Sequence, residues 1–365
     1  MEPSKSMRNP ELDSLRALSV MLVVAAHVGF NFIPGGFGVT VFFVISGYII
    51  TRLLLEEFSY YGNIDIRKFY FRRFWKLFPP FLAIIFIPSV IFFYKFDLNG
   101  MAILAQLFFY FNWYTELYGS VGVFPGTGVV WSLSIEEQFY IAIALCVSLT
   151  LKLKSSAFIS IFKYTFVALW ILSTAFRLGL AHIYKNSMHD ETGNLPRIYL
   201  GTDTRISSIC IGGLLAILSP TIVNRKFVSK LTSVLLVFVS ILVIFSTLLI
   251  RDVFFRDSIR FTLQEFSVAI LIFTGVVLKM WPSFLNALAR NRLIQKIGLA
   301  SYSIYLSHLI LIILITNLFD INETQIGYQI IQLVLIVLVV AAGIALHHLF
   351  DLPFEKQRQK YRRLR

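Results

Sequence analysis

The residues best suited to chemistry lie near the N-terminus, inside an otherwise apolar run. Asp13, Arg16 and His27 share this run, and ionisable groups in a membrane-spanning helix are costly and by default mark a functional path. At about 100° per residue, Arg16 and His27 fall on one helical stripe, about 16 Å apart along the axis. Asp13 precedes Arg16 by three positions and falls on the same face. The spacing therefore predicts a polar stripe through the membrane.

His27 is the candidate base of this stripe, because histidine is the side chain that titrates most readily near neutral pH. It lies about two-thirds of the way along the predicted span 14–33. The alternative is a buried histidine that forms a hydrogen bond between helices. The shared stripe with Asp13 and Arg16 favours the functional interpretation.

A candidate carboxylate lies in the stretch WSLSIEEQFY. Ser132, Glu136 and Tyr140 fall on one helical face at four-residue spacing. The next carboxylate, Glu137, fits a capping box that begins at Ser134. Glu136 has no such explanation, so we expect it to orient or charge-stabilise the imidazole from the same outer half of the membrane.

The densest positive charge is in the run IRKFYFRRFWKLFPP, which holds no acid. Arg72 and Lys76 share a helical face beside Arg73, and such a cluster binds phosphate well. The alternatives are a topology signal or a site for anionic lipid headgroups. The two prolines that end the run are expected in the first turn of the next span.

Other polar residues interrupt apolar runs. Ser46 and Gly47 form a small pair that lets a helix or a ligand approach the backbone, or that serves ordinary helix packing. Ser301, Tyr305 and His308 repeat at helical spacing in SYSIYLSHLIL, either as a functional face or as interhelical hydrogen bonds.

Two arginines, Arg177 and Arg205, are expected near outer helix ends. Extension of each side chain to the headgroups, with its stem in the membrane, is one explanation for both residues. Arg205 is placed among the supporting residues, and the Gly212-Gly213 pair that follows it predicts close helix packing there.

Composition identifies the class of protein that carries these residues. Of the 365 residues, 57% are hydrophobic and 15% are charged, and the mean hydropathy is +0.75. These values predict an all-α polytopic membrane protein. The two cysteines, Cys146 and Cys210, lie in apolar runs, which disfavours a disulfide framework or a thiolate metal site. No metal is expected.

Apolar runs of sufficient length predict about ten transmembrane helices. The run 101–112, at about 12 residues, suits a re-entrant or interfacial segment instead. The predicted spans are 14–33, 37–55, 78–95, 131–150, 157–181, 205–219, 230–250, 261–280, 297–316 and 327–350.

The distribution of charge predicts the orientation of these spans. With the N-terminus in the cytoplasm, strict alternation puts about three quarters of the 33 Lys and Arg residues on the cytoplasmic side. Both termini are therefore expected in the cytoplasm. This bias also explains the net charge of +13 without nucleic acid. We expect one membrane domain at 1–355 and a basic cytoplasmic tail at 356–365 that lies against membrane lipid.

Taken together, these motifs resemble the acyltransferase 3 family of integral membrane O-acyltransferases, of the O-antigen acetylase type. The resemblance spans nearly the whole chain. Lys76 stands where the family has a third arginine, and it keeps the charge but lacks the planar fork. The matching motifs are Arg16 with His27 after ten positions, FFxxSG at Phe42–Gly47, RRxxKxxP from Arg72, Ser132-Leu133-x-x-Glu136, Ser301-Tyr302-x-x-Tyr305-Leu306-x-His308, and Asp351-Leu352-Pro353-Phe354.

The resemblance implies transfer of an acyl group, most often acetyl, from cytoplasmic acetyl-CoA or another acyl-CoA. The acceptor would be a hydroxyl of an extracytoplasmic glycan or lipid-linked glycan, such as O-antigen, capsule or another surface polysaccharide. The membrane would be the bacterial inner membrane. Direct transfer and a transient acyl group on His27 or a serine both fit this scheme.

The resemblance also implies a role for each candidate residue. His27 would be the general base and Glu136 would orient it. Ser46 or His308 would steady the oxyanion. Asp13 would position Arg16. The residues expected to bind the donor are Arg16, Ser46, Arg72, Arg73 and Lys76. The residues expected to support the substrate are Ser132, Arg205, Tyr305 and His308.

Two other classes of function remain open on the sequence. A transporter or flippase of a glycan or lipid-linked sugar suits polytopic form and polar intramembrane faces, although no repeated half and no paired broken helices are visible. A membrane sensor or scaffold would leave the stripe that ends at His27 dispensable.

Overall fold

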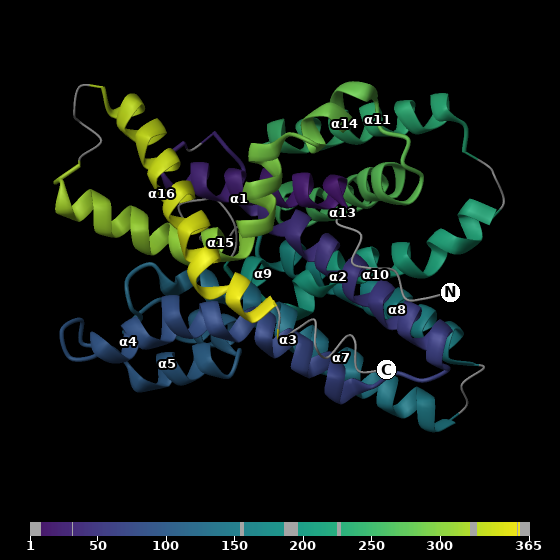
Figure 1. Cartoon of the computed structure of the whole chain (residues 1–365), viewed down its shortest axis with the longest axis horizontal. Coiled ribbons are helices and arrows are strands. Elements are labelled where there is room, and N and C mark those ends of the chain that lie inside the picture. Colours follow the sequence, from purple (N-terminus) through teal and green to yellow (C-terminus); the bar gives the residue numbers. More distant parts are fainter. Residues whose placement is uncertain are drawn as a thin grey trace. The chain divides into compact units, whose positions relative to one another are not determined.

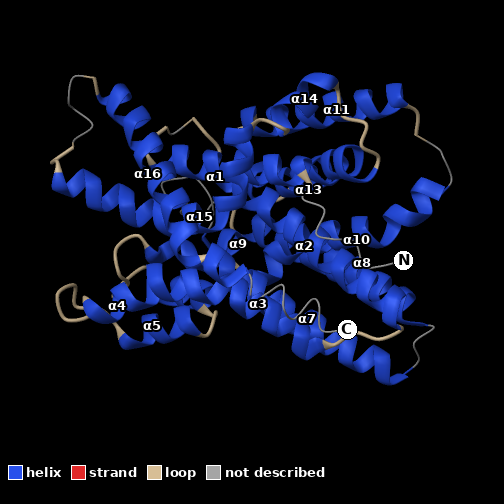
Figure 2. Cartoon of the chain, in the orientation of Figure 1, coloured by secondary structure: helices blue, strands red, loops and turns tan. Residues whose placement is uncertain are grey.

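A computed structural model describes residues 9–30, 32–153, 157–185, 196–224, 228–321, 327–355 and 357. Figure 2 shows helices and loops, and the described residues contain no strand. The chain forms two compact units. The first contains Met1–Leu15, Val39–Ile64 and Ile135–Ile294, and the second contains Arg16–Gly38, Asp65–Ser134 and Gln295–Arg365.

Most helices of the first unit come from the middle of the chain, which Figure 1 colours teal to green. α10 packs along α8, and α11 packs along α13. The helices are α2 at Gly35–Tyr61 and α7 at Val130–Leu153, which both start in the second unit, α8 at Phe158–Ile183, α9 at Pro196–Leu200, α10 at Thr202–Asn224, α11 at Lys230–Leu249, α12 at Val253–Asp257, α13 at Ile259–Ile272 and α14 at Ser283–Ala289.

The second unit is built from helices near both ends of the chain. α16 packs against α3 in this unit. Its helices are α1 at Pro10–His27, which starts in the first unit, α3 at Ile66–Phe81, α4 at Ile87–Ile91, α5 at Gly100–Leu107, α6 at Phe111–Tyr118, α15 at Arg292–Leu318, which also starts in the first unit, and α16 at Tyr328–Phe350.

The length and composition of these helices confirm an all-α polytopic membrane protein. Within the described ranges, nine helical segments are long and apolar enough to cross a membrane. They coincide with nine of the ten predicted spans. The predicted first span corresponds to α1, whose 18 residues include Glu11, Asp13 and Arg16, more charge than an ordinary apolar span carries.

The bounds of α1 correct the predicted span 14–33. The helix begins at Pro10 because Asn9 caps it, accepting a hydrogen bond from the Leu12 N–H at 3.2 Å. It ends at His27, just before Gly29, whose φ of +106° a helix does not permit. His27 is therefore the last residue of the helix rather than two-thirds of the way along it.

The basic run also differs from the prediction. It forms helix α3 itself, and Pro79 and Pro80 lie inside this helix instead of opening a new one. A proline removes an N–H and crowds the carbonyl four residues earlier. The helix nevertheless continues through both prolines, and a π-helical turn at Leu82–Phe86 follows it before α4. One continuous segment, Ile66–Ile91, thus carries both the charge and a span.

The run 101–112 divides into α5 and α6. Between them Phe109 has a φ of +54°, which ends α5. Each helix has 8 residues, or about 12 Å of rise, well short of the apolar thickness of a bilayer. The re-entrant or interfacial placement stays a prediction, but neither helix is long enough for a full crossing.

The predicted capping box at Ser134 is wrong. α7 begins at Val130, so Ser134 and Glu137 lie inside the helix. The Ser134 hydroxyl donates to the Val130 carbonyl at 3.2 Å, a bond typical of helix interiors. The predicted basic tail at 356–365 lies outside the described residues, apart from residue 357.

Helices α2 and α10 approach each other closely at two glycines. A Cβ at Gly47 would lie 1.9 Å from the Ile209 carbonyl oxygen, and a Cβ at Gly212 would lie 2.0 Å from the Val44 carbonyl oxygen. Both obstacles are backbone atoms, which cannot rotate away. The packing explanation offered for the Ser46-Gly47 pair therefore holds for Gly47.

Alanine at Gly47 is expected to destabilise the protein by about 1–3 kcal/mol, because the added methyl group forces α2 and α10 apart. The matched control is Gly179→Ala in α8, where a Cβ meets nothing within 4 Å. This control is expected to be neutral or slightly stabilising. Thermal unfolding of both variants in the same detergent tests the prediction, and equal melting temperatures would contradict it.

Candidate functional site

His27 and His308 lie side by side in the second unit. Their ring centroids are 5.0 Å apart with an interplanar angle of 62°. His27 ends α1 with an exposed side chain, whereas His308 is fully buried in α15. The sequence predicted both residues for the site without predicting that they are neighbours.

Hydrogen bonds fix the orientation of both rings. The Nδ1 of His27 lies 2.8 Å from the Val23 carbonyl oxygen, and the Nδ1 of His308 lies 2.6 Å from the Tyr305 carbonyl oxygen. A carbonyl only accepts, so each Nδ1 carries the proton and each Nε2 of the neutral ring keeps its lone pair. The exposed His27 thus presents an Nε2 that can accept a proton.

Polar groups from α7 and α15 extend this cluster. The hydroxyls of Ser132 and Tyr305 lie 2.8 Å apart, and Tyr305 also donates to the Val129 carbonyl at 3.3 Å. The ring of Tyr305 lies 5.5 Å from that of His308. Four predicted site residues therefore gather in the second unit. They are His27, His308, Tyr305 and Ser132.

Glu136 belongs to a second cluster, in the first unit. Its Oε2 accepts hydrogen bonds from the Tyr140 hydroxyl at 2.7 Å and from the Ser46 hydroxyl at 3.0 Å. The two hydroxyls also contact each other. The structure thus joins the predicted Ser46 and Glu136, which are far apart in the chain.

Tyr140 is the residue of this cluster that sequence reasoning missed as a site residue, although its four-residue spacing from Glu136 was the available signal. The predicted pairing of Glu136 with His27 involves residues of different units and stays a prediction.

Arg205 does not extend toward headgroups, so that alternative is wrong. Its side chain is fully buried in the first unit and donates to the Thr40 hydroxyl at 3.2 Å. Its guanidinium carbon lies 4.2 Å from the ring centroid of Phe261 and 5.4 Å from that of Tyr199. Aromatic faces stabilise a desolvated guanidinium in this way.

Arg177 is also fully buried, and it pairs with Glu265 of α13. The Arg177 Nη1 lies 3.4 Å from the Glu265 Oε1 and donates to the Thr204 carbonyl at 2.9 Å. The same carboxylate oxygen accepts from Ser207 at 2.7 Å and from Ser208 at 2.8 Å. The sequence carried a signal for Glu265, because it is an acid within an apolar span.

The donor-binding candidates Arg72, Arg73 and Lys76 lie on α3 with half-buried side chains. Asp65 caps this helix and accepts from the Lys68 N–H at 3.1 Å. That hydrogen bond holds the pKa of the Asp65 carboxyl below its ordinary value. The remaining predicted residues, Asp13 and Arg16, lie on α1, buried and half-buried respectively.

The motif near the C-terminus has a structural explanation. Phe354 stacks on Trp75 of α3 with ring centroids 5.3 Å apart. Asp351 accepts from the His347 Nδ1 at 2.8 Å, and Tyr302 of α15 donates to the Leu77 carbonyl at 2.9 Å. The Phe354 and Tyr302 contacts join α3 to α15 and to the segment after α16, whereas the Asp351 contact lies within the end of α16.

Comparison with known proteins identifies the class of protein that carries these clusters. The model of the acyltransferase 3 family, described as an acyltransferase domain, matches residues 9–348. The chain therefore belongs to this family, as its motifs predicted, and it is an integral membrane protein. No solved structure matches it.

Two relatives are similar over most of this chain. The peptidoglycan O-acetyltransferase OatA of Listeria monocytogenes serovar 1/2a is 30% identical over 345 residues, which cover 88% of this chain and 52% of that protein. The O-acetyltransferase OatA of Staphylococcus aureus is 30% identical over 370 residues, which cover 95% of this chain and 57% of that protein. The chain thus spans about half the length of these relatives.

Proposed function

We propose that this protein is a membrane-bound O-acetyltransferase that acetylates a hydroxyl of an extracytoplasmic glycan. Family membership supports acyl transfer, and the names of its relatives favour peptidoglycan over O-antigen as the acceptor. The observation that carries the proposal is the exposed His27, whose Nδ1 is committed to a backbone carbonyl and whose Nε2 is free to act as a base.

The chemistry follows from that nitrogen. The His27 Nε2 takes the proton of the acceptor hydroxyl as its oxygen attacks the thioester carbonyl of the donor. The tetrahedral intermediate then expels the coenzyme A thiolate, and the imidazolium returns its proton to that sulfur. His308, packed against His27, holds the ring in place.

The donor in this proposal is acetyl-CoA bound from the cytoplasmic side. The cations of α3 suit its phosphates, because three positive side chains lie within two turns of one helix. The distribution of Lys and Arg supports this orientation, with both termini in the cytoplasm of a bacterium and the protein in its inner membrane.

Substituting both Arg72 and Arg73 with alanine is expected to weaken acetyl-CoA binding at least about tenfold, because two charge-assisted hydrogen bonds to phosphate are lost. The matched control is Lys163→Ala in α8, which removes a cation that lies against the Tyr164 ring, 4.7 Å from its centroid. Equilibrium binding of labelled acetyl-CoA to the purified variants measures the effect. Unchanged affinity of the double variant would remove α3 from the donor site.

Reconstituted vesicles test the proposed function itself. Vesicles that contain the protein are loaded with labelled acetyl-CoA and supplied externally with peptidoglycan strands that lack O-acetyl groups. We expect label to appear on the strands as an alkali-labile ester. Label that never leaves the donor would contradict the proposal, and movement of glycan across the membrane without consumption of the donor would favour a transporter.

A further inference from the structure

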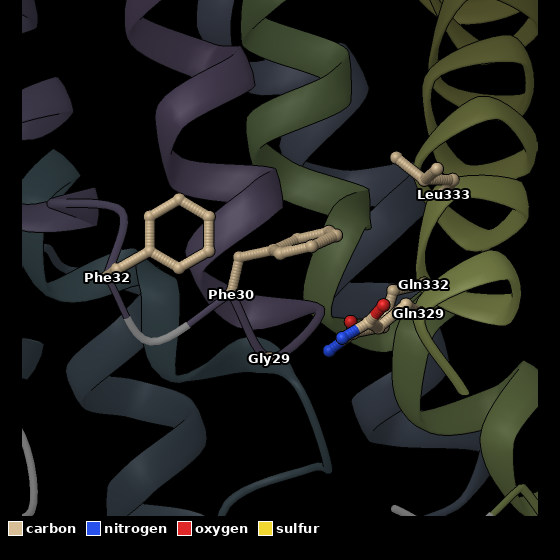
Figure 3. Close-up of a pocket in the computed structure, with 6 residues that line it drawn as sticks. All are labelled: Gly29, Phe30, Phe32, Gln329, Gln332 and Leu333. Carbon is tan, nitrogen blue, oxygen red and sulfur yellow. The ribbon is translucent and has the colours of Figure 1, made fainter. Parts of the chain in front are cut away.

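An open hollow of about 590 Å³ lies in the second unit, where the turn after α1 meets the first turns of α16 (Figure 3). It begins two residues after His27. Its lining residues are Gly29, Phe30, Phe32, Gln329, Gln332 and Leu333.

The turn at Gly29, which forms one side of the hollow, is fixed by its backbone conformation and by the buried amide of Gln332. The Gln332 Nε2 donates to the Val28 carbonyl at 3.2 Å, and this side chain is 4% exposed. Gly29 has a φ of +106°, and a Cβ there would lie 2.7 Å from the Gln332 Nε2. The turn that follows His27 therefore needs glycine and packs directly on α16.

The lining combines amides with aromatic rings. Figure 3 shows the side chains of Gln329 and Gln332 extending from α16 toward the turn at Gly29. Phe30 and Phe32 lie edge to face, with centroids 5.8 Å apart, and Phe32 is 77% exposed. An amide offers both a donor and an acceptor, and an aromatic face offers an apolar surface.

This chemistry suits a sugar ring. Sugar hydroxyls pair with amides while the C–H face of the ring stacks on an aromatic side chain, which is the mixture of few polar groups and apolar walls that small-molecule sites use. None of the six lining residues is charged. A neutral carbohydrate therefore fits the hollow better than the phosphates of coenzyme A, which require cations.

We propose that this hollow binds a sugar ring of the acceptor glycan and presents one of its hydroxyls to His27. The inference rests on the proposed function and deepens it, because it assigns the acceptor site to the turn after α1 and the start of α16. The site holds a neutral sugar through the amides of Gln329 and Gln332 and the ring of Phe32. Donor and acceptor are then recognised by different residues.

Two variants test the site, Phe32→Ala and Gln329→Ala. The control is Phe319→Ala, which removes a comparably exposed ring, 67% accessible, from the segment after α15 and outside the hollow. Each full-length protein is reconstituted and assayed with acetyl-CoA and soluble peptidoglycan strands that lack O-acetyl groups. Binding of labelled strands is measured separately, without any donor.

Each hollow variant is expected to raise the KM for the strands and to weaken their binding about tenfold, which is the loss of one stacking or hydrogen-bonding contact. The KM for acetyl-CoA is expected to stay unchanged, and Phe319→Ala is expected to match the wild type. Unchanged strand binding in both hollow variants would overturn the acceptor site. So would an equal loss in Phe319→Ala, since that would reveal anchoring of exposed rings in the membrane.

The two proposals fail in different ways. A wild-type protein that acetylates the strands, with hollow variants that bind them normally, would overturn the acceptor site alone. A wild-type protein that binds the strands through Phe32 and Gln329 but transfers no acetyl group would overturn the proposed function and leave a glycan-binding site without a reaction.

Discussion

Substituting His27 with alanine is expected to lower the rate of acetyl transfer by roughly 10²–10⁴-fold, the usual contribution of a general base. The reason is geometric. The Nδ1 donates to the Val23 carbonyl, so Nε2 alone accepts a proton, and the ring is exposed at the end of α1. Initial rates of reconstituted protein with saturating acetyl-CoA measure the loss.

The matched control is His182→Ala, which removes another exposed histidine, near the end of α8. This variant is expected to keep the wild-type rate. Acetyl-CoA binding should be unchanged in His27→Ala, because the base acts on the acceptor. A His27→Ala protein that inserts correctly and transfers acetyl at a near-normal rate would contradict the proposed mechanism.

Removing either charge of the Arg177–Glu265 pair is expected to destabilise the protein by about 3–5 kcal/mol, since the remaining charge is left buried without its counter-ion. Both side chains are fully buried. Glu265→Leu should suffer most, because three hydroxyl or guanidinium donors converge on its Oε1. The free energy of unfolding in detergent measures the loss.

A double variant separates charge from packing. Arg177→Met combined with Glu265→Leu replaces the ion pair with apolar side chains and should recover much of the loss of either single variant. The surface control, Arg251→Ala, removes an exposed arginine and should change stability by about 0.5 kcal/mol or less. Wild-type stability in Glu265→Leu would show that the pair contributes nothing.

The sequence predicts the spans of this protein because a transmembrane helix requires a continuous run of about 20 apolar residues, which is visible in the sequence itself. Nine predicted spans therefore coincide with helices. The predicted ends of two helices are wrong, because the local backbone conformation decides where a helix stops. α1 ends early at the Gly29 turn, and α3 continues through Pro79 and Pro80, residues that usually end or kink a helix.

The side chains of the candidate site were predictable by type and spacing, but their partners were not. Ser46 reaches Glu136 and Tyr140 across 90 and 94 residues of chain, and His27 meets His308 from opposite ends of the sequence. Such pairs are set by tertiary packing, for which hydropathy and periodicity carry no signal. For the same reason, the burial of Arg177 and Arg205 was missed.

The central claim is that this protein adds acetyl groups to a cell-surface glycan through His27. Mass spectrometry of peptidoglycan fragments from cells that lack the gene, complemented with the wild type or with His27→Ala, tests it most directly. We predict an acetyl-sized mass gain, removed by mild alkali, in cells with the wild-type protein alone. Identical fragment masses in all three, or the same gain with His27→Ala, would contradict the claim.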